Sequence, residues 1–254
     1  MKIGVLDSGL GGLSLVKEIF SREVNVEIEY YGDLKNAPYG TKSSSEVLEL
    51  VSSGVAYLLD QNCAAIVLAC NTATSVAVEN IRNTFGEKHK IPVFGMEPAI
   101  KPALELMPQD KICVLATPLT LNETKYKNLV STLDTAGRVQ SIPMPGLSSA
   151  VDAFDFPAAF GVLQKNLSHL DSSLNYIFVL GCTHYSFLKK ELLSLFPKSR
   201  IVDGNFGTCN HVLNTISKLN FTEASESRFH ANLVGGSSQD YENADRLLKG
   251  EFHE

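Results

Sequence analysis

Two short apolar runs that lie 112 positions apart end in the same way, and this repeat narrows what the chain can fold into. The runs are Ile66–Thr72 (IVLACNT) and Phe178–His184 (FVLGCTH). In each, strand-like sequence stops at a cysteine and helical sequence follows. Short apolar runs that alternate with longer helical patterns are typical of βα units and a parallel sheet. We therefore expect an α/β protein in which two related strands each deliver a cysteine to the carboxyl edge of a sheet.

A second pair of matching runs extends the repeat over most of the chain. Lys2–Ser8 (KIGVLDS) corresponds to Lys111–Thr117 (KICVLAT) at an offset of 109. Two correspondences in the same order predict two similar parallel-sheet α/β domains related by pseudo-twofold symmetry, with the active site between them. The first domain is expected to contain residues 1–97 and 208–254, and the second residues 98–207. Chance similarity between apolar strands is the alternative.

The same patterns place the individual elements. Helical segments between the strands include residues 10–21 and 184–196, and a final helix follows the last strand. The strands are expected near residues 2–7, 26–31, 64–69, 92–95, 111–116, 138–142, 174–180, 200–203 and 229–234.

Composition limits the partners and the location. The chain of 254 residues has a net charge of −6 and no basic cluster, which argues against nucleic acid or an anionic membrane as the main partner. No apolar run approaches the roughly 18 residues of a transmembrane helix, and the N-terminus lacks a signal-peptide pattern. The five cysteines are an odd number and lie far apart. We therefore expect reduced thiols and a cytoplasmic protein.

Asp7 and Ser8 open a glycine-containing loop, DSGLGG, between the first expected strand and the first expected helix. A dinucleotide-binding fingerprint is one interpretation, but Asp7 would place a carboxylate where a pyrophosphate must lie. A small substrate with an ammonium and a carboxylate suits Asp7 and Ser8 better. A plain turn with Asp7 as a helix cap is the structural alternative.

A second loop, residues 33–42, contains turn residues near the end of the second strand. The segment Pro38, Tyr39 and Gly40 could offer backbone N–H groups to a substrate carboxylate while Tyr39 covers the pocket. An ordinary surface turn would have the same composition.

Cys70 and Cys182 are the main candidates for chemistry. Each begins an expected helix, where the pKa of a thiol falls below its usual value of about 8.5, so we expect thiolate to form near neutral pH. The remaining cysteines, Cys63, Cys113 and Cys209, are expected to be small buried hydrophobes. Polar residues that follow the two candidates are suited to bind an amino acid, and they are Asn71, Thr72, Thr183 and His184.

Two thiols on opposite sides of one substrate suit a reaction that moves a proton from one face of a carbon to the other. His184 could orient Cys182, and Asp7 could do the same for Cys70 or bind a substrate ammonium. A nucleophilic Cys–His pair for hydrolysis would use one cysteine and leave the other idle. A zinc site formed by Cys70, Cys182 and His184 would lack close-spaced ligand pairs. No lysine motif indicates pyridoxal phosphate, so we expect neither a cofactor nor a metal.

At these residues the chain resembles the cofactor-independent glutamate racemases. The resemblance rests on DSGLGG at 7–12, Asp33 with PYG at 38–40, ACNTA at 69–73 and GCTHY at 181–185. It implies conversion of L-glutamate to D-glutamate for peptidoglycan synthesis, with two cysteines as the bases of a 1,1-proton transfer, and a homodimer is expected. The residues that it implies as bases are Cys70 and Cys182, and those that it implies as substrate contacts are Asp7, Ser8, Tyr39, Gly40, Asn71, Thr72, Thr117, Thr183 and His184.

The segment Pro145–Asp152 (PGLSSAVD) departs from this family, which has a glutamate there that supports catalysis. Asp152 would replace that glutamate only if the backbone shifted, and we expect that it does not. His184 would then lack its support. The departure supports one alternative, a catalytically weakened amino-acid-binding homologue. An aspartate or other amino-acid racemase, or a decarboxylase of the same fold that uses one cysteine, is the other alternative.

Overall fold

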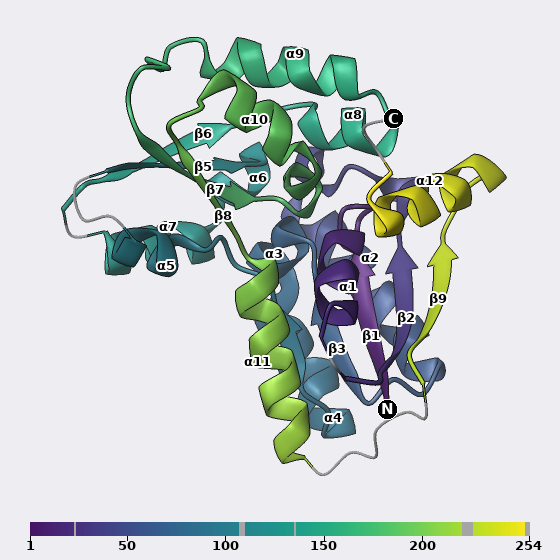
Figure 1. Ribbon diagram of the computed structural model, residues 1–254. Coiled ribbons are helices and arrows are strands. Elements are labelled where there is room, and N and C mark those ends of the chain that lie inside the picture. Colours follow the sequence, from purple (N-terminus) through teal and green to yellow (C-terminus); the bar gives the residue numbers. More distant parts are fainter. Residues whose placement is uncertain (23, 107–109, 135, 220–225, 252–254) are drawn as a thin grey trace.

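The computed structural model describes residues 1–22, 24–106, 110–134, 136–219 and 226–251, which form two parallel sheets with helices packed around them (Figure 1). One sheet has the strand order β4-β3-β1-β2-β9 and the other has the order β6-β5-β7-β8. All paired neighbours run parallel. The strands are β1 (Lys2–Asp7), β2 (Glu27–Gly32), β3 (Ala65–Leu68), β4 (Val93–Gly95), β5 (Lys111–Ala116), β6 (Val139–Pro143), β7 (Tyr176–Gly181), β8 (Arg200–Asp203) and β9 (Arg228–Leu233).

The two sheets repeat one topology. The order β6-β5-β7-β8 matches β2-β1-β3-β4 strand for strand, so β5 corresponds to β1 and β7 corresponds to β3. These are the pairs that the sequence repeat relates, and the predicted α/β fold class is confirmed. We call the part built on β1–β4 and β9 the first half, and the part built on β5–β8 the second half.

The helices cover both faces of the two sheets. In Figure 1, α11 leaves the end of β8 in the second half and runs down beside the first half, where it packs against α1. The helices are α1 (Leu13–Phe20), α2 (Ser44–Asp60), α3 (Asn71–Ile81), α4 (Glu87–His89), α5 (Ile100–Leu106), α6 (Pro118–Asn122), α7 (Thr124–Leu133), α8 (Leu147–Asp152), α9 (Phe156–Leu167), α10 (Lys189–Leu195), α11 (Asn205–Lys218) and α12 (Ser238–Lys249). Short turns of 3-10 helix are η1 (Leu34–Asn36), η2 (Tyr39–Thr41) and η4 (Thr183–Leu188), and η3 (Arg82–Gly86) is a π-helical continuation of α3.

Strands β3 and β7 are apolar along their whole length, as suits strands that helices cover on both faces. Every residue of β3 and of β7 is buried, as expected for parallel strands that have no solvated side. One core cluster includes Val5 and Leu15 from the first half together with Leu147 and Phe178 from the second. The halves therefore share a continuous apolar core next to the loops that carry the candidate residues. The predicted division at residues 97/98 and 207/208 remains a prediction, and its second boundary falls within α11.

Two elements begin differently from the sequence-based expectation. α1 begins at Leu13 and not near residue 10, because the backbone N–H groups of Gly9 and Leu10 bind carboxylates and do not continue a helix. The helix expected over 184–196 opens as the 3-10 turn η4, in which the Tyr185 N–H donates to the Cys182 carbonyl, and α10 follows. Both differences occur where the loops of the two halves meet.

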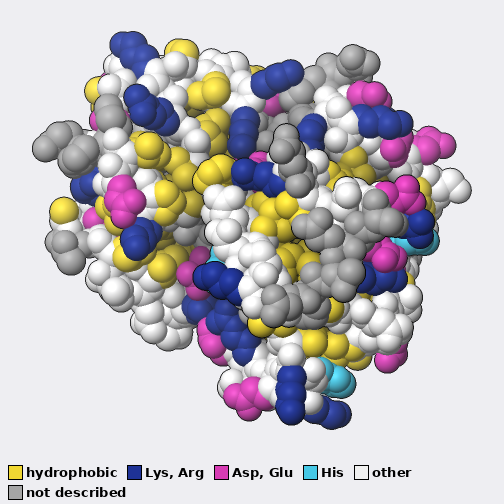
Figure 2. Space-filling view, turned by 60° about the horizontal axis from the view of Figure 1, so that its bottom comes forward, with side chains coloured by type: hydrophobic (Ala, Val, Ile, Leu, Met, Phe, Trp, Pro, Cys, Tyr) yellow, Lys and Arg dark blue, Asp and Glu magenta, His cyan; other side chains and the backbone are white. Residues whose placement is uncertain are grey.

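In the part of the chain that the structure describes, no helix is both long and apolar enough to cross a membrane. Figure 2 shows one face of the molecule, on which lysine and arginine side chains are spread among acidic and apolar ones over both halves.

Candidate active site

Cys70 follows the end of β3 and caps the N-terminus of α3. Its Sγ accepts a hydrogen bond from the Ala73 N–H at 3.5 Å and donates to the Ser8 Oγ at 3.7 Å. Burial, together with the charge of Asp7, raises the pKa of the Cys70 thiol to about 12, although the hydrogen bond from the Ala73 N–H acts in the opposite direction. The prediction of a lowered pKa at this helix terminus is therefore wrong for Cys70, because desolvation outweighs the backbone dipole.

Asp7 ends β1 and connects the two halves. One of its oxygens accepts from the Gly9 N–H at 3.0 Å, and the other accepts from the Thr183 hydroxyl at 3.0 Å. Burial raises the pKa of Asp7, whereas His184 and the two hydrogen bonds act in the opposite direction. The side chain is fully buried. A carboxylate in this position attracts a cation and holds a loop of the second half at the same time.

Cys182 follows the end of β7 and has His184 beside it. The Cys182 Sγ lies 3.7 Å from His184 Nδ1, so the structure brings together the pair that the sequence placed two residues apart. A negative charge on Cys182 would raise the pKa of Cys70. Both thiols are buried, with 8% of Cys182 and 5% of Cys70 exposed.

Asp152 pairs with His184, which corrects the expectation that Asp152 does not replace the missing glutamate. His184 Nε2 and Asp152 Oδ1 are 2.8 Å apart. Asp152 is the last residue of α8, and Gly9 lets it approach, because a Cβ on Gly9 would lie 2.6 Å from Asp152 Oδ1. The short aspartate reaches His184 because its helix lies close to the glycine loop of the first half.

The pKa of His184 reflects two opposed effects. Burial of the ring lowers it, but the charge and hydrogen bond of Asp152, with a contribution from Cys182, raise it well above the usual range. The raised pKa favours the protonated form of His184, which lies between Asp152 and Cys182.

The loop that contains Pro38 reaches from the first half to the second. Its Tyr39 is buried, and the Tyr39 hydroxyl donates to Asp33 Oδ2 at 2.8 Å. A Cβ on Gly40 would lie 2.7 Å from the Thr117 Cβ, so this loop packs directly against the start of α6. Asp33 therefore fixes the loop through Tyr39.

Three buried hydroxyls meet where the halves join. Thr72 lies 3.0 Å from Thr117 and 3.1 Å from Thr120, and Thr117 and Thr120 are 2.9 Å apart, all measured between Oγ1 atoms. Sequence reasoning identified Thr72 and Thr117 but missed Thr120. The available signal was its position at the start of α6, three residues after the helix cap Thr117.

Asn71 contributes an acceptor without a protein partner. Its Nδ2 donates to the Met96 carbonyl at 3.0 Å, which leaves Oδ1 free. That oxygen is buried and has no hydrogen-bond partner among the described residues. A buried acceptor of this kind is costly unless something binds it.

The polar groups of the site belong to both halves. The structure brings three pairs of predicted residues together across the two halves: Asp7 with Thr183, Thr72 with Thr117, and Gly40 with Thr117. Two other contacts lie within one half, namely Cys70 with Ser8 and Cys182 with His184. Among the described residues, no group of three or more His, Cys, Asp or Glu side chains is arranged to hold a metal ion. The arrangement presents two thiols, the carboxylates of Asp7, Asp33 and Asp152, the His184 ring and several hydroxyl groups.

Known proteins are similar to this chain in sequence and in fold. The family described as Asp/Glu/hydantoin racemase matches residues 28–209. A protein named glutamate racemase from Leptospira interrogans is 50% identical over 216 residues, which are 85% of this chain and 83% of that protein. A glutamate racemase from Clostridium novyi is 44% identical over 211 residues, covering 82% of this chain and 80% of that protein.

The chain is also similar to solved structures of glutamate racemases. Escherichia coli glutamate racemase, in complex with L-glutamate and the activator UDP-MurNAc-Ala, superposes with a TM-score of 0.80 at 25% identity, covering 98% of this chain and 94% of that chain. Glutamate racemase from Thermus thermophilus, in complex with β-chloro-D-alanine, gives a TM-score of 0.76 at 30% identity, covering 97% of this chain and 92% of that chain.

Proposed function

Since the chain belongs to the Asp/Glu/hydantoin racemase family and is an isomerase of the glutamate racemase type, we propose that it interconverts L-glutamate and D-glutamate with Cys70 and Cys182 as its two bases. The observation that carries this proposal is the pair of buried cysteines at corresponding strand ends of the two halves, beside polar residues that bond across the halves. Each thiol also has a polar neighbour that can take part in proton transfer, Ser8 beside Cys70 and His184 beside Cys182.

The reaction needs one thiolate and one thiol. The thiolate takes the Cα proton and becomes a thiol, and the electron pair of the broken C–H bond stays on the substrate. The opposite thiol then donates its proton to the other face of Cα and becomes a thiolate. The next turnover in the same direction requires the two sulfurs to exchange protons with solvent. No cofactor is needed for this balance.

Asp7 and the substrate ammonium are proposed to control Cys70. The charge of Asp7 is one cause of the raised pKa of Cys70. An ammonium group beside Asp7 would neutralise that effect, so that the thiolate of Cys70 forms more easily when substrate is bound. The free Oδ1 of Asn71 is a second acceptor suited to the same ammonium.

The substrate carboxylates are proposed to bind the hydroxyl groups. Thr72, Thr117 and Thr120 bond to one another in the structure, and each hydroxyl can rotate to donate to a carboxylate. Buried donors aimed at a carboxylate stabilise the charge that develops on it when the Cα proton leaves. Tyr39, held by Asp33, covers this side of the site.

The position of Asp152 supports an active enzyme over a catalytically weakened homologue. It takes the position beside His184 that the sequence comparison left empty, and His184 holds its charge 3.7 Å from the Cys182 Sγ. A cation at this distance stabilises a thiolate. We therefore propose that His184 and Asp152 support Cys182 in catalysis.

The proposed role in the cell follows from the product. D-Glutamate is a building block of bacterial peptidoglycan, and we propose that the protein supplies it in the cytoplasm. The described cysteines are all free thiols, which supports a reducing compartment. We propose a homodimer as well, which light scattering on the purified protein would test.

The decisive experiment measures chirality and deuterium together. Each glutamate enantiomer is incubated with enzyme in deuterated water, and the products are separated by chiral chromatography. The opposite enantiomer should appear with deuterium at Cα, and Cys70→Ser or Cys182→Ser should reduce its formation by about 10³-fold, since each removes one acid–base group. Aspartate and hydantoins serve as competing substrates. Full racemisation by either variant would rule out the two-thiol scheme.

A further inference from the structure

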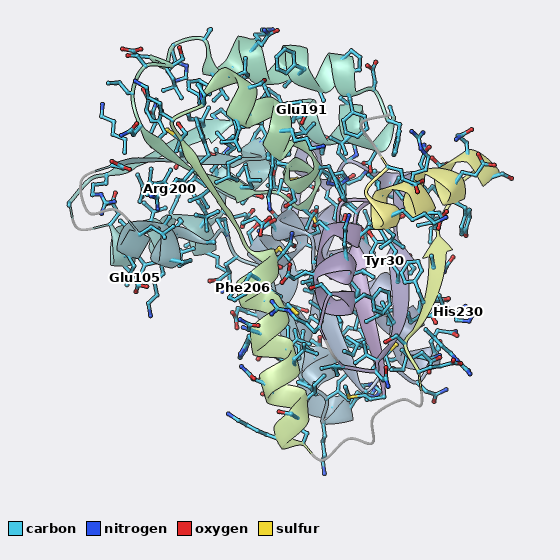
Figure 3. The ribbon with its side chains drawn as sticks, in the orientation of Figure 1. Tyr30, Glu105, Glu191, Arg200, Phe206 and His230 are labelled. Atoms are coloured by element: carbon cyan, nitrogen blue, oxygen red, sulfur yellow. The ribbon has the colours of Figure 1, made fainter. Side chains whose placement is uncertain are left out.

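The peptide between Gly9 and Leu10 is held from both sides. The Tyr30 hydroxyl donates to the Gly9 carbonyl at 2.7 Å, and the Leu10 N–H donates to Asp152 Oδ1 at 3.0 Å. Tyr30 belongs to β2 in the first half, where Figure 3 labels it, and Asp152 belongs to α8 in the second half. This one peptide unit therefore accepts a hydrogen bond from the first half and donates a hydrogen bond to the second half.

The hydrogen bonds continue to a candidate base. Asp152 Oδ1, which accepts from Leu10, also pairs with His184 Nε2 at 2.8 Å, and His184 Nδ1 lies 3.7 Å from the Cys182 Sγ. An unbroken series of contacts thus leads from Tyr30 in the first half to the thiol of the second half. Tyr30 itself contacts neither Asp152 nor Cys182 by any described hydrogen bond.

Close packing keeps Tyr30 in this place. Its side chain is fully buried, and a Cβ on Gly12 or on Gly32 would lie 3.0 Å from its ring or hydroxyl. Burial raises the pKa of Tyr30 well above its usual range, so the hydroxyl keeps its proton and remains a donor. Gly12 and Gly32 leave room for the phenol of Tyr30, and Gly9 leaves room for the Asp152 carboxylate.

We propose that Tyr30 is a positioning residue for Cys182, acting across the two halves through the Gly9–Leu10 peptide, Asp152 and His184. A donor on the Gly9 carbonyl polarises the amide and strengthens the Leu10 N–H as a donor. It also fixes the plane of the peptide, and with it the direction from which Asp152 is held. This inference rests on the proposed function, in which Cys182 is one of the two bases.

The test compares two tyrosine-to-phenylalanine variants that each lose one hydroxyl. Tyr30→Phe removes the donor to Gly9 and keeps the ring. Tyr57→Phe is the matched control, because the Tyr57 hydroxyl donates to Glu29 at 3.0 Å on the far side of the same strand and touches no candidate residue. We expect Tyr30→Phe to lower kcat about fivefold with KM nearly unchanged, the loss of one good hydrogen bond. Tyr57→Phe should keep both constants.

A double-mutant cycle tests the route. In an Asp152→Asn background the peptide no longer positions a charged partner of His184, so Tyr30→Phe should there lower kcat by less than about twofold. The same loss of kcat in both backgrounds would overturn the proposal, as would equal losses in Tyr30→Phe and Tyr57→Phe. Thermal unfolding of each variant identifies losses that come from stability alone.

Nuclear magnetic resonance separates this inference from the proposed function. The Leu10 amide proton and the ring nitrogens of ¹⁵N-labelled His184, assigned with a His184→Gln variant, report the contacts without any turnover. Tyr30→Phe should shift the Leu10 amide upfield and move the His184 nitrogens, and Tyr57→Phe should move neither. A protein that does not racemise glutamate but shows these shifts would refute only the function. Unmoved signals in Tyr30→Phe would refute the connection.

Discussion

The two cysteine sites of this protein arise from one repeated pattern, yet their electrostatic surroundings are opposite. Cys70 lies near a carboxylate, Asp7, which raises the pKa of its thiol. Cys182 lies beside an imidazolium, His184, whose charge Asp152 maintains. One thiol therefore faces an anion and the other faces a cation. The proposed two-thiol reaction needs acid–base groups that differ in protonation, and the opposite charges beside the two sulfurs are consistent with that need.

The difference can be traced to two positions of the repeat. At the offset of 109, Asp7 at the end of β1 corresponds to Ala116 at the end of β5. At the offset of 112, His184 corresponds to Thr72. The strands and the cysteines were kept alike, while one charged residue in each half has an uncharged counterpart in the other. Duplication explains the symmetry of the fold, and these residues explain the asymmetry of the site.

The difference between the two cysteine sites can be tested by the rate at which Cys70 is alkylated. The pH dependence of this rate is the largest effect that we expect. Because the pKa of Cys70 is raised to about 12, its thiolate fraction should grow about tenfold per pH unit, or about a hundredfold from pH 7 to pH 9. Iodoacetamide labelling followed by peptide mass spectrometry measures this, with Cys182→Ser removing the competing thiol. A rate at Cys70 that levels off below pH 9 would contradict the assigned environment.

A smaller effect is expected when the charge on the Cys182 side is removed. Asp152→Asn keeps the shape of the side chain but removes the charge that favours protonated His184. We therefore expect kcat to fall roughly 30-fold, which is part of the 10²- to 10⁴-fold rate increase that general acid–base catalysis provides. Steady-state kinetics in both directions measure it. Asp155→Asn is the control, since Asp155 caps α9 through the Ala158 N–H and asparagine caps equally well. Equal losses in the two variants would show that Asp152 acts only on folding.

The smallest effect concerns the contact between the halves. A Cβ on Gly11 would overlap His184 and Thr183, so Gly11→Ala should destabilise the protein by about 1–3 kcal/mol. Gly161→Ala in α9 has no heavy atom within 4 Å of the new Cβ, and should stabilise it by about 0.5–1 kcal/mol through helix propensity. Thermal unfolding monitored by circular dichroism distinguishes the two. An unchanged midpoint in Gly11→Ala would mean that the halves are not held together at this loop.

Local sequence was sufficient for much of the fold and for the identity of the candidate bases. Strands that are covered on both faces need continuous apolar runs, so β3 and β7 could be read directly, and the end of such a strand must carry the polar residues of an α/β site. The pKa of Cys70 could not be read in this way. It depends on how many atoms exclude water from the sulfur, and those atoms come from segments far apart in the chain.

Sequence by itself determined the duplicated α/β architecture, the two cysteines at equivalent strand ends and the small polar residues that follow them, because these depend on periodicity and on neighbouring residues. Only the tertiary structure decided that Asp152 reaches His184, that Thr120 joins Thr72 and Thr117, and that Tyr30 and Asp152 hold one peptide between them. The physical reason is that hydrogen bonds and charges act over a few ångströms, and most of the residues that meet within that distance are far apart in the chain.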